Sequence, residues 1–600
     1  MTRRRPGGRL RSCIVVAAAL ILLPAPSHAD RLLHFSVTPA TIDDVATAAI
    51  NGDGMVVMRL RSKNAEGLLR KAEVVASRLT ELALGGLKPG QVVVERLDGE
   101  WAVVGRGELI VTADADTVNA SGQTAQALCE GWRARIAEVL AEAYLCVEPD
   151  DLLIVPHGET RDIRFGGTIA AAPTVESMSP AVASAERRDG RVVVRGVKTG
   201  TTVVVVEVGK ARAAVTIDVK KWAARIAGSA SLTKLSGGLP EPMREVALLN
   251  AALSAVAAEP RANIDIMNLA ASATGYSVSL RAGGEEYLPV TKHVQIGVRE
   301  APSGLRGTRA LLVSNYPEKV TGRGALMRQR LDRGVPTRLM WHHKNHAGRP
   351  MVATVRLVNA GSEPARISVG WSQAGPNPDE IYVGYNAMLR YWETVRRGAG
   401  FVANVPPATA FETSAMRMGH HDVVSGLMDL MAEAGEHLYV EMLARDPADA
   451  PHGYSRISPT AAELALTPYH FPATIEAEMD YEVGGRFEHL SIGREDVVND
   501  QGFALAGAYG VSHLITVNAS NPTEAPATLE LALRAGGGVA RTVAIIDGVI
   551  NTSGILSAGH EQILERRPLP PGVSRKLELE IIPTAGSNLP FTLVVRSRNC

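Results

Sequence analysis

Two stretches, VRLVNAGSEPARISV at residues 355–369 and VNASNPTEAPATLEL at residues 517–531, share one pattern. Each has an apolar segment, an asparagine, four intervening residues, a proline and a second apolar segment. Asn359 therefore corresponds to Asn521, and Pro364 corresponds to Pro526. Two strands joined by a short Asn/Gly/Pro turn make a β-hairpin. The repeat predicts two β-sandwich domains in the C-terminal half, at residues 301–445 and 446–600.

The first predicted sandwich contains two segments with a helical pattern. DEIYVGYNAMLRYWETVRRG, residues 379–398, predicts a helix whose aromatic face packs against the sandwich. VVSGLMDLMAEAG, residues 423–435, predicts a second, apolar helix. We therefore expect a helical insertion over residues 379–435 inside this domain.

The segments upstream of the sandwiches have different patterns. Residues 30–147 predict a small α/β module with the order β-α-β-β-α. Residues 148–220 contain Val-rich strands and Gly-containing turns, which predict a compact β domain. Residues 221–242 are rich in Gly, Ser and Pro and predict a linker, and residues 243–300 predict an α+β or β region. The expected fold class is mostly β and multi-domain.

The first 29 residues have the pattern of a secretory signal peptide. Five arginines precede an apolar run from Cys13 to Leu23, and Ser27-His28-Ala29 has small residues at the −3 and −1 positions of a cleavage site. The apolar run is about half the length that a bilayer needs. We therefore expect an exported chain, periplasmic or extracellular, without a transmembrane segment after cleavage.

The charge balance argues against nucleic acid as a partner. The 600-residue chain has 63 Lys and Arg and 63 Asp and Glu, and removal of residues 1–29 leaves an excess of acidic residues. A nucleic-acid-binding chain needs a basic surface. The remaining cysteines have no CxxC or Cys/His metal spacing, and the helical distance between Cys129 and Cys146 is too great for a disulfide.

Part of the chain resembles a known family. The pattern LxVPxGExR at residues 153–161, followed by VVVRGVKTGTTVVVV and a closing AVTIDV, resembles the pilus-formation protein N-terminal domain, which precedes secretins. The resemblance implies an envelope module that binds other proteins, although no secretin barrel region follows. The run from WAVVGRGELIV to CEGWRARIAEVL looks like an extracytoplasmic module found ahead of bacterial envelope domains. The Asn-turn-Pro strand pairs resemble those of immunoglobulin-like bacterial surface β-sandwiches.

No motif identifies an enzyme. The sequence has no GxSxG, HExxH, Walker A loop or helix-opening GxGxxG. Ser231-Leu-Thr-Lys234 and Lys198-Thr199-Gly200 fit SxxK and KTG, but their order is reversed relative to penicillin-recognising enzymes. The sequence therefore predicts that the chain is not an enzyme, with no catalytic or cofactor-binding residue and no cofactor.

The densest group of histidines is WHHKNH, residues 341–346. If this segment is a strand, His343 faces inward with Trp341 while His342 faces outward, because adjacent strand residues point to opposite faces. They therefore cannot bind one metal ion together, and no metal ligand is predicted. The sequence leaves open whether His342 or His343 meets His420 or His421 across the domain.

These observations predict an exported bacterial cell-envelope or surface protein that acts by protein–protein interaction, in pilus- or secretion-type assembly or in adhesion. Envelope or surface proteins are its expected partners, and unpaired edge strands are the expected means of binding. The alternatives are a secreted carbohydrate-active or carbohydrate-binding protein and a periplasmic metal-binding protein. A carbohydrate site would need a cleft with convergent carboxylates or exposed aromatic side chains. The oligomeric state is not predicted.

Overall fold

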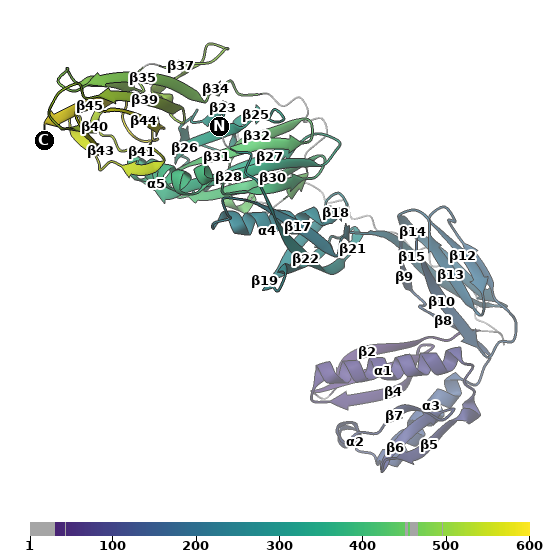
Figure 1. Cartoon of the computed structure of the whole chain (residues 1–600). Coiled ribbons are helices and arrows are strands. Elements are labelled where there is room, and N and C mark those ends of the chain that lie inside the picture. Colours follow the sequence, from purple (N-terminus) through teal and green to yellow (C-terminus); the bar gives the residue numbers. More distant parts are fainter. Residues whose placement is uncertain are drawn as a thin grey trace, which may run out of the picture. The chain divides into compact units, whose positions relative to one another are not determined.

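The computed structural model describes residues 31–42, 44–305, 307–449, 454–456, 466–494 and 496–599 (Figure 1). The predicted signal peptide lies outside these residues. The chain divides into two compact units, of which the first extends to Trp222 and includes Glu285–Leu288, and the second contains the rest. Strands dominate both units, so the prediction of a mostly β, multi-domain chain is confirmed.

The first unit begins with the α/β module. An antiparallel sheet, β2-β3-β4, packs against α1, and a second sheet, β5-β6-β7, is followed by two helices. The predicted order β-α-β-β-α is found from β4 to α3, with β2, β3, β7 and α2 as additional elements. The bounds are β2 (Phe35–Ile42), β3 (Val45–Gly52), β4 (Met55–Ser62), α1 (Ala65–Leu84), β5 (Val92–Leu97), β6 (Glu100–Gly105), β7 (Glu108–Thr112), α2 (Ala115–Ser121) and α3 (Ala125–Val139).

Side-chain caps fix where the helices of this module begin. The Asn64 side chain accepts a hydrogen bond from the Gly67 amide at the start of α1, and Thr124 accepts one from Ala127 at the start of α3. Both helices bury one apolar stripe in a shared core. Cys129 and Cys146 are buried free thiols in this core, so the structure has no disulfide between them.

A Val-rich β-sandwich completes the first unit. One sheet has the order β1-β8-β10-β13-β12, and the other has the order β11-β14-β15-β21 with β9 also paired to β15. The alternating valines of β14 and β15 face inward and form the core. The bounds are β1 (Arg31–Leu32), β8 (Tyr144–Glu148), β9 (Leu152–Pro156), β10 (Thr160–Gly167), β11 (Thr174–Ser177), β12 (Ala183–Arg188), β13 (Arg191–Gly196), β14 (Gly200–Val208), β15 (Ala211–Trp222) and β21 (Tyr287–Leu288).

The second unit opens with elements that the sequence assigned to a linker. Residues 221–242 contain β16 (Ala224–Ile226) and β17 (Ser229–Leu235), so the linker prediction is wrong. β17 pairs in parallel with β22 and so belongs to a long sheet, which its Gly/Ser content did not indicate. The elements that follow are α4 (Met243–Ser254), β18 (Val256–Ala258), β19 (Asn263–Ser272), β20 (Gly275–Gly283) and β22 (Val290–Ala301).

The long sheet continues into the first predicted sandwich. Its order is β19-β20-β22-β17-β29-β28-β31-β26-β23-β34, with β24 also paired to β26, and the opposing sheet is β25-β32-β27-β30-β33. Helix α5 (Glu380–Glu393), followed by the short turn η2 (Val395–Arg397), covers β28 and β31. The strands are β23 (Ala310–Ser314), β24 (Lys319–Val320), β25 (Gly324–Arg330), β26 (Thr337–Asn345), β27 (Met351–Asn359), β28 (Ala365–Asn377), β29 (Phe401–Val405), β30 (Thr409–Met418), β31 (Val423–Ala434), β32 (Leu438–Arg445), β33 (Tyr454–Arg456) and β34 (His470–Pro472).

Half of the predicted helical insertion is wrong. The helix expected at residues 379–398 is α5, but the segment 423–435 forms strand β31 in the middle of the long sheet. Most β31 residues are buried on both faces, because the opposing sheet covers one face and α5 covers the other. A strand buried on both faces reads as a continuous apolar run, which periodicity cannot distinguish from a buried helix.

A second sandwich is present at the C-terminus, but it begins at β35 and not at residue 446, because β33 and β34 pair with strands of the first sandwich. Its two sheets have the orders β35-β39-β44-β41-β42 and β36-β45-β40-β43, and their inward residues form one core. The strands are β35 (Thr474–Glu482), β36 (Glu488–Ile492), β37 (Val497–Val498), β38 (Ala504–Leu505), β39 (Ser512–Ser520), β40 (Ala527–Ala535), β41 (Val543–Ile546), β42 (Val549–Thr552), β43 (Glu561–Leu569), β44 (Ser574–Ile581) and β45 (Phe591–Asn599).

The Asn-turn-Pro repeat does not form the predicted hairpin, because its two strands lie in opposite sheets, β27 and β28 in one sandwich and β39 and β40 in the other. The repeat has one hydrogen-bonding scheme in both sandwiches. The buried Asn359 amide donates to the carbonyl oxygens of Glu363 and Val405, and its Oδ1 accepts from the Gly361 amide. Asn521 makes the equivalent bonds to its own turn and to Leu569. One side chain thus closes the turn and ties it to a neighbouring segment.

Replacement of either asparagine by alanine should destabilise its sandwich. Asn521→Ala leaves two carbonyl oxygens and one amide N–H without their partner, so we expect a loss of about 1–3 kcal/mol in the free energy of unfolding. Urea denaturation measures it. Asn551→Ala is the control, because the Asn551 side chain makes a single exposed hydrogen bond, to the Val549 carbonyl at the start of the same short strand, β42. Equal stability of the two variants would contradict the role given to Asn521.

Candidate functional site

The segment WHHKNH lies in β26 and the turn that follows it. The His343 ring donates from Nδ1 to the Pro317 carbonyl (3.1 Å) and accepts at Nε2 from the Ser314 hydroxyl (2.9 Å), because a carbonyl oxygen can only accept. His342 was expected to face solvent, but it is only 4% exposed. That expectation is wrong because α5 and the C-terminal sandwich cover the outward face of β26.

Neither His342 nor His343 meets the second histidine pair. The ring that contacts it belongs to His346, whose centroid lies 5.1 Å from that of His421 and 6.4 Å from that of His420. Among the described residues, no group of three His, Cys, Asp or Glu side chains is already placed to hold a metal ion.

The stability of this unit should fall in mild acid because of the two buried histidines. Burial lowers the pKa of His342 to about 4 and that of His343 to about 3, whereas an unfolded histidine titrates near 6.5. As the pH falls below 6.5 the unfolded chain therefore binds protons that the folded chain does not. We expect each histidine to remove about 2 kcal/mol of unfolding free energy between pH 7.5 and pH 5.

Urea denaturation at the two pH values measures this loss. Replacement of His343 by Gln, which cannot be protonated in this range, should reduce the pH dependence even where it lowers stability at pH 7.5. An unchanged pH dependence would show that the buried imidazole is not its source.

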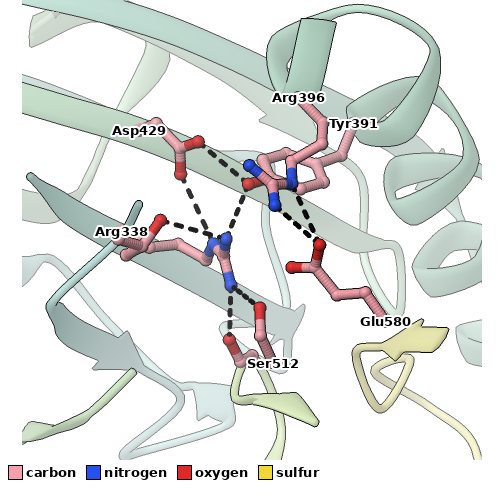
Figure 2. Close-up of polar contacts among 8 residues, drawn as sticks. Arg338, Tyr391, Arg396, Asp429, Ser512 and Glu580 are labelled. Carbon is pink, nitrogen blue, oxygen red and sulfur yellow. Dashed lines mark hydrogen bonds and ion pairs between the residues drawn. The ribbon is translucent and has the colours of Figure 1, made fainter. Parts of the chain in front are cut away.

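A buried polar centre of the second unit is formed by the guanidinium of Arg338, which is 1% exposed (Figure 2). It donates to Tyr391 OH (2.7 Å) and to Asp429 Oδ1 (3.4 Å), while Tyr391 OH donates to Asp429 Oδ2 (2.9 Å). Burial acts to lower the pKa of Arg338, but Tyr391, Asp429 and Glu580 raise it above its ordinary value. The guanidinium is therefore charged.

Arg338 also joins the two sandwiches. Its Nη1 donates to the Gly510 carbonyl (3.1 Å), just before β39. The same nitrogen donates to Oγ of Ser512, the first residue of β39 (2.9 Å; Figure 2). Arg396 of η2 forms a second link, with its Nη2 2.7 Å from Glu580 Oε2 on β44. An apolar cluster from both sandwiches surrounds these contacts. The contacts of Arg338 and Arg396 therefore hold the two sandwich domains together at a joint.

Sequence reasoning did not single out Arg338 or Asp429. Each is a lone charge inside an apolar run, PTRLMW and VVSGLMDLM, and the two charges have opposite signs. Buried charges are normally paired, so this was the signal that could have identified the pair.

Removal of one member of this pair should be more damaging than removal of both. Arg338→Met leaves the Asp429 carboxylate buried without its cation, and we expect a loss of about 3–5 kcal/mol in unfolding free energy. The double variant Arg338→Met, Asp429→Leu should lose less, because no unpaired charge remains. Urea denaturation followed by tryptophan fluorescence measures both, and a double variant as unstable as the sum of the single variants would contradict the charge argument.

A cleft of about 830 Å³ lies beside this joint. Its floor is the outer face of the C-terminal sheet, where Glu476 and Glu478 on β35 and Glu578 and Glu580 on β44 flank β39. Trp392, Arg396 and Arg397 form the wall on the side of α5. Four carboxylates therefore line this cleft, and that of Glu580 is paired with Arg396.

The aromatic side chains of α5 do not offer a stacking surface. Trp392, Tyr391 and Tyr385 are 2%, 0% and 7% exposed, and only Tyr382, at 50%, is open among the four aromatic residues of this helix. Three of them pack against the sandwiches as predicted, but the prediction is wrong for Tyr382. The aromatic residues of α5 therefore do not support the carbohydrate alternative.

The outermost strand of the long sheet, β19, forms a different kind of site. Within the described residues it pairs only with β20, so its other edge carries unpaired backbone groups. Its ten residues, NIDIMNLAAS, include one charged side chain, and Ile266 and Leu269 are 37% and 45% exposed. A bulge between Met267 and Ala270 is the main irregularity.

Comparison with known proteins gives similarity of fold only. No protein-family model matches the chain, and no curated protein is significantly similar to it. The pilus-formation resemblance is therefore not shown. No helix in the described part of the chain is long and apolar enough to cross a membrane.

Three solved structures illustrate the similarity. The M60 catalytic domain with CBM51 domains of Clostridium perfringens ZmpB is 8% identical, with a TM-score of 0.16; the match covers 80% of this chain and 59% of that one. Domains 5–6 of the S-layer protein SbsC are 10% identical (TM-score 0.13), and the match covers 46% of this chain and 95% of that one. The titin segment I67–I69, which has three immunoglobulin domains, is 7% identical (TM-score 0.13), and the match covers 46% of this chain and 97% of that one. With TM-scores of 0.13–0.16, these matches transfer no role to this chain.

The prediction that the chain is not an enzyme is contradicted by this comparison, because one of the similar structures contains an M60 catalytic domain. That exclusion is withdrawn. Identities of 7–10% assign no reaction to this chain.

Proposed function

We propose that this chain is an exported envelope or surface protein that binds a partner protein by strand addition at β19. The observation that carries the proposal is the open edge of β19, which ends the longest sheet within the described residues. An edge strand presents N–H and C=O groups that can pair with an added strand.

The composition of β19 supports this use. Natural proteins usually protect edge strands with charged residues or proline, and the edge strand β12 has such protection, with Glu186, Arg187 and Arg188 in ASAERR. β19 has no proline and a single charge, Asp265, over ten residues. The expected occupant is an extended, weakly charged segment of an envelope or surface protein, with apolar side chains that pack beside Ile266 and Leu269.

A charge on the open edge should weaken the interaction without unfolding the domain. Leu269→Lys places an ammonium group where a partner strand would exclude water, so we expect a several-fold loss of the cross-linked complex recovered from intact cells. Ile555→Lys is the matched control, because Ile555 is 65% exposed in the C-terminal sandwich.

Both variants should unfold at the urea concentration of the parent protein, which excludes misfolding as the cause. The proposal fails if Leu269→Lys and Ile555→Lys yield the same amount of complex, or if cross-linking recovers only the monomer.

A further inference from the structure

One group of side chains outside the proposed docking edge has the composition of a metal site. His346, in the turn after β26, faces His420 and His421, in the turn between β30 and β31. The two turns belong to one sandwich but lie more than 70 positions apart in the sequence.

The backbones of these turns are tied together by hydrogen bonds. The Asn345 amide N–H donates to the Asp422 carbonyl and the His421 N–H donates to the Asn345 carbonyl, both at 2.9 Å. The buried Asn345 side chain donates further bonds to the carbonyl oxygens of Met418 (3.1 Å) and Gly419 (2.9 Å). The three histidines therefore project from a fixed scaffold, which lowers the cost of ordering them around a ligand.

The spacing of the rings is close to that of bound imidazoles. Metal–nitrogen bonds of about 2 Å in a tetrahedral site place two ring centroids roughly 5 Å apart. The His346 and His421 centroids are 5.1 Å apart. His420 is 6.4 Å from His346 and 3.7 Å from His421, so it joins the same ion only after its exposed side chain adopts a rotamer that lies farther from His421 and closer to His346.

A second observation points to a missing partner. His346 Nε2 is buried and has no hydrogen-bond partner, although a buried polar atom normally has one. The Lys344 ammonium is paired with Glu380 at 2.7 Å, which reduces its repulsion of a bound cation.

We propose that His346, His420 and His421 bind one divalent transition-metal ion, with water completing the coordination. Imidazole ligands suit Zn²⁺, Ni²⁺ and Cu²⁺. The site is independent of strand addition at β19.

Calorimetric titration of the mature, tag-free and chelator-treated protein with ZnCl₂ tests the proposal. We expect one equivalent of Zn²⁺ per chain, and at least about tenfold weaker binding in His346→Ala and in His421→Asn. Asparagine is chosen at position 421 because it tolerates the left-handed backbone there, where φ is +67°. Titration with CoCl₂ should give a visible absorption spectrum that these variants lose.

His437→Asn is the matched control. His437 is an exposed histidine of the same sandwich, also with a left-handed backbone, at φ +52°, and its replacement should leave Zn²⁺ binding unchanged. The proposal is overturned if the parent protein binds no stoichiometric Zn²⁺, if His346→Ala binds it as tightly as the parent, or if His437→Asn loses as much affinity as His421→Asn.

Discussion

The buried guanidinium of Arg338 is the constraint on which the second unit depends. A charge without solvent must be fully paired, and here its partners come from β31, from α5 and from the segment that precedes β39. The guanidinium can be satisfied only when these three segments are all in place. Pairing therefore couples the fold of the first sandwich to the position of the second.

Helix α5 makes this arrangement possible because it occupies the joint. Gly384 of α5 lies so close to the C-terminal sandwich that an added Cβ would be 1.8 Å from the Ala585 carbonyl oxygen. The same helix supplies Tyr391 to Arg338 and leads into Arg396, which pairs with Glu580. The cleft next to η2 exists because α5 and η2 stand beside the outer face of the C-terminal sheet.

Sequence reasoning succeeded where a local rule decides the structure. The Asn359 and Asn521 turns follow from one side chain that satisfies its own turn, and α5 follows from its apolar stripe. Sequence reasoning failed where contacts with distant segments determine the secondary structure. β31 became a strand because it is covered on both faces, and β17 became a strand because β22 pairs with it. No sequence pattern within β17 or β31 indicates these contacts with distant segments.

The histidines show how a local rule and a distant contact combine. The spacing Asn-x₄-Pro recurs at Asn345 and Pro350, and Asn345 makes the same bonds as Asn359 and Asn521, to Ala347, to Arg349 and across to Met418. The sequence repeat therefore has a third copy within WHHKNHAGRP. In each copy the asparagine fixes a turn against a neighbouring segment, so the next residue has a defined position. At Asn345 that residue is His346, and the neighbouring segment carries His420 and His421. The turn that stabilises the sandwich thus also brings the three imidazoles together.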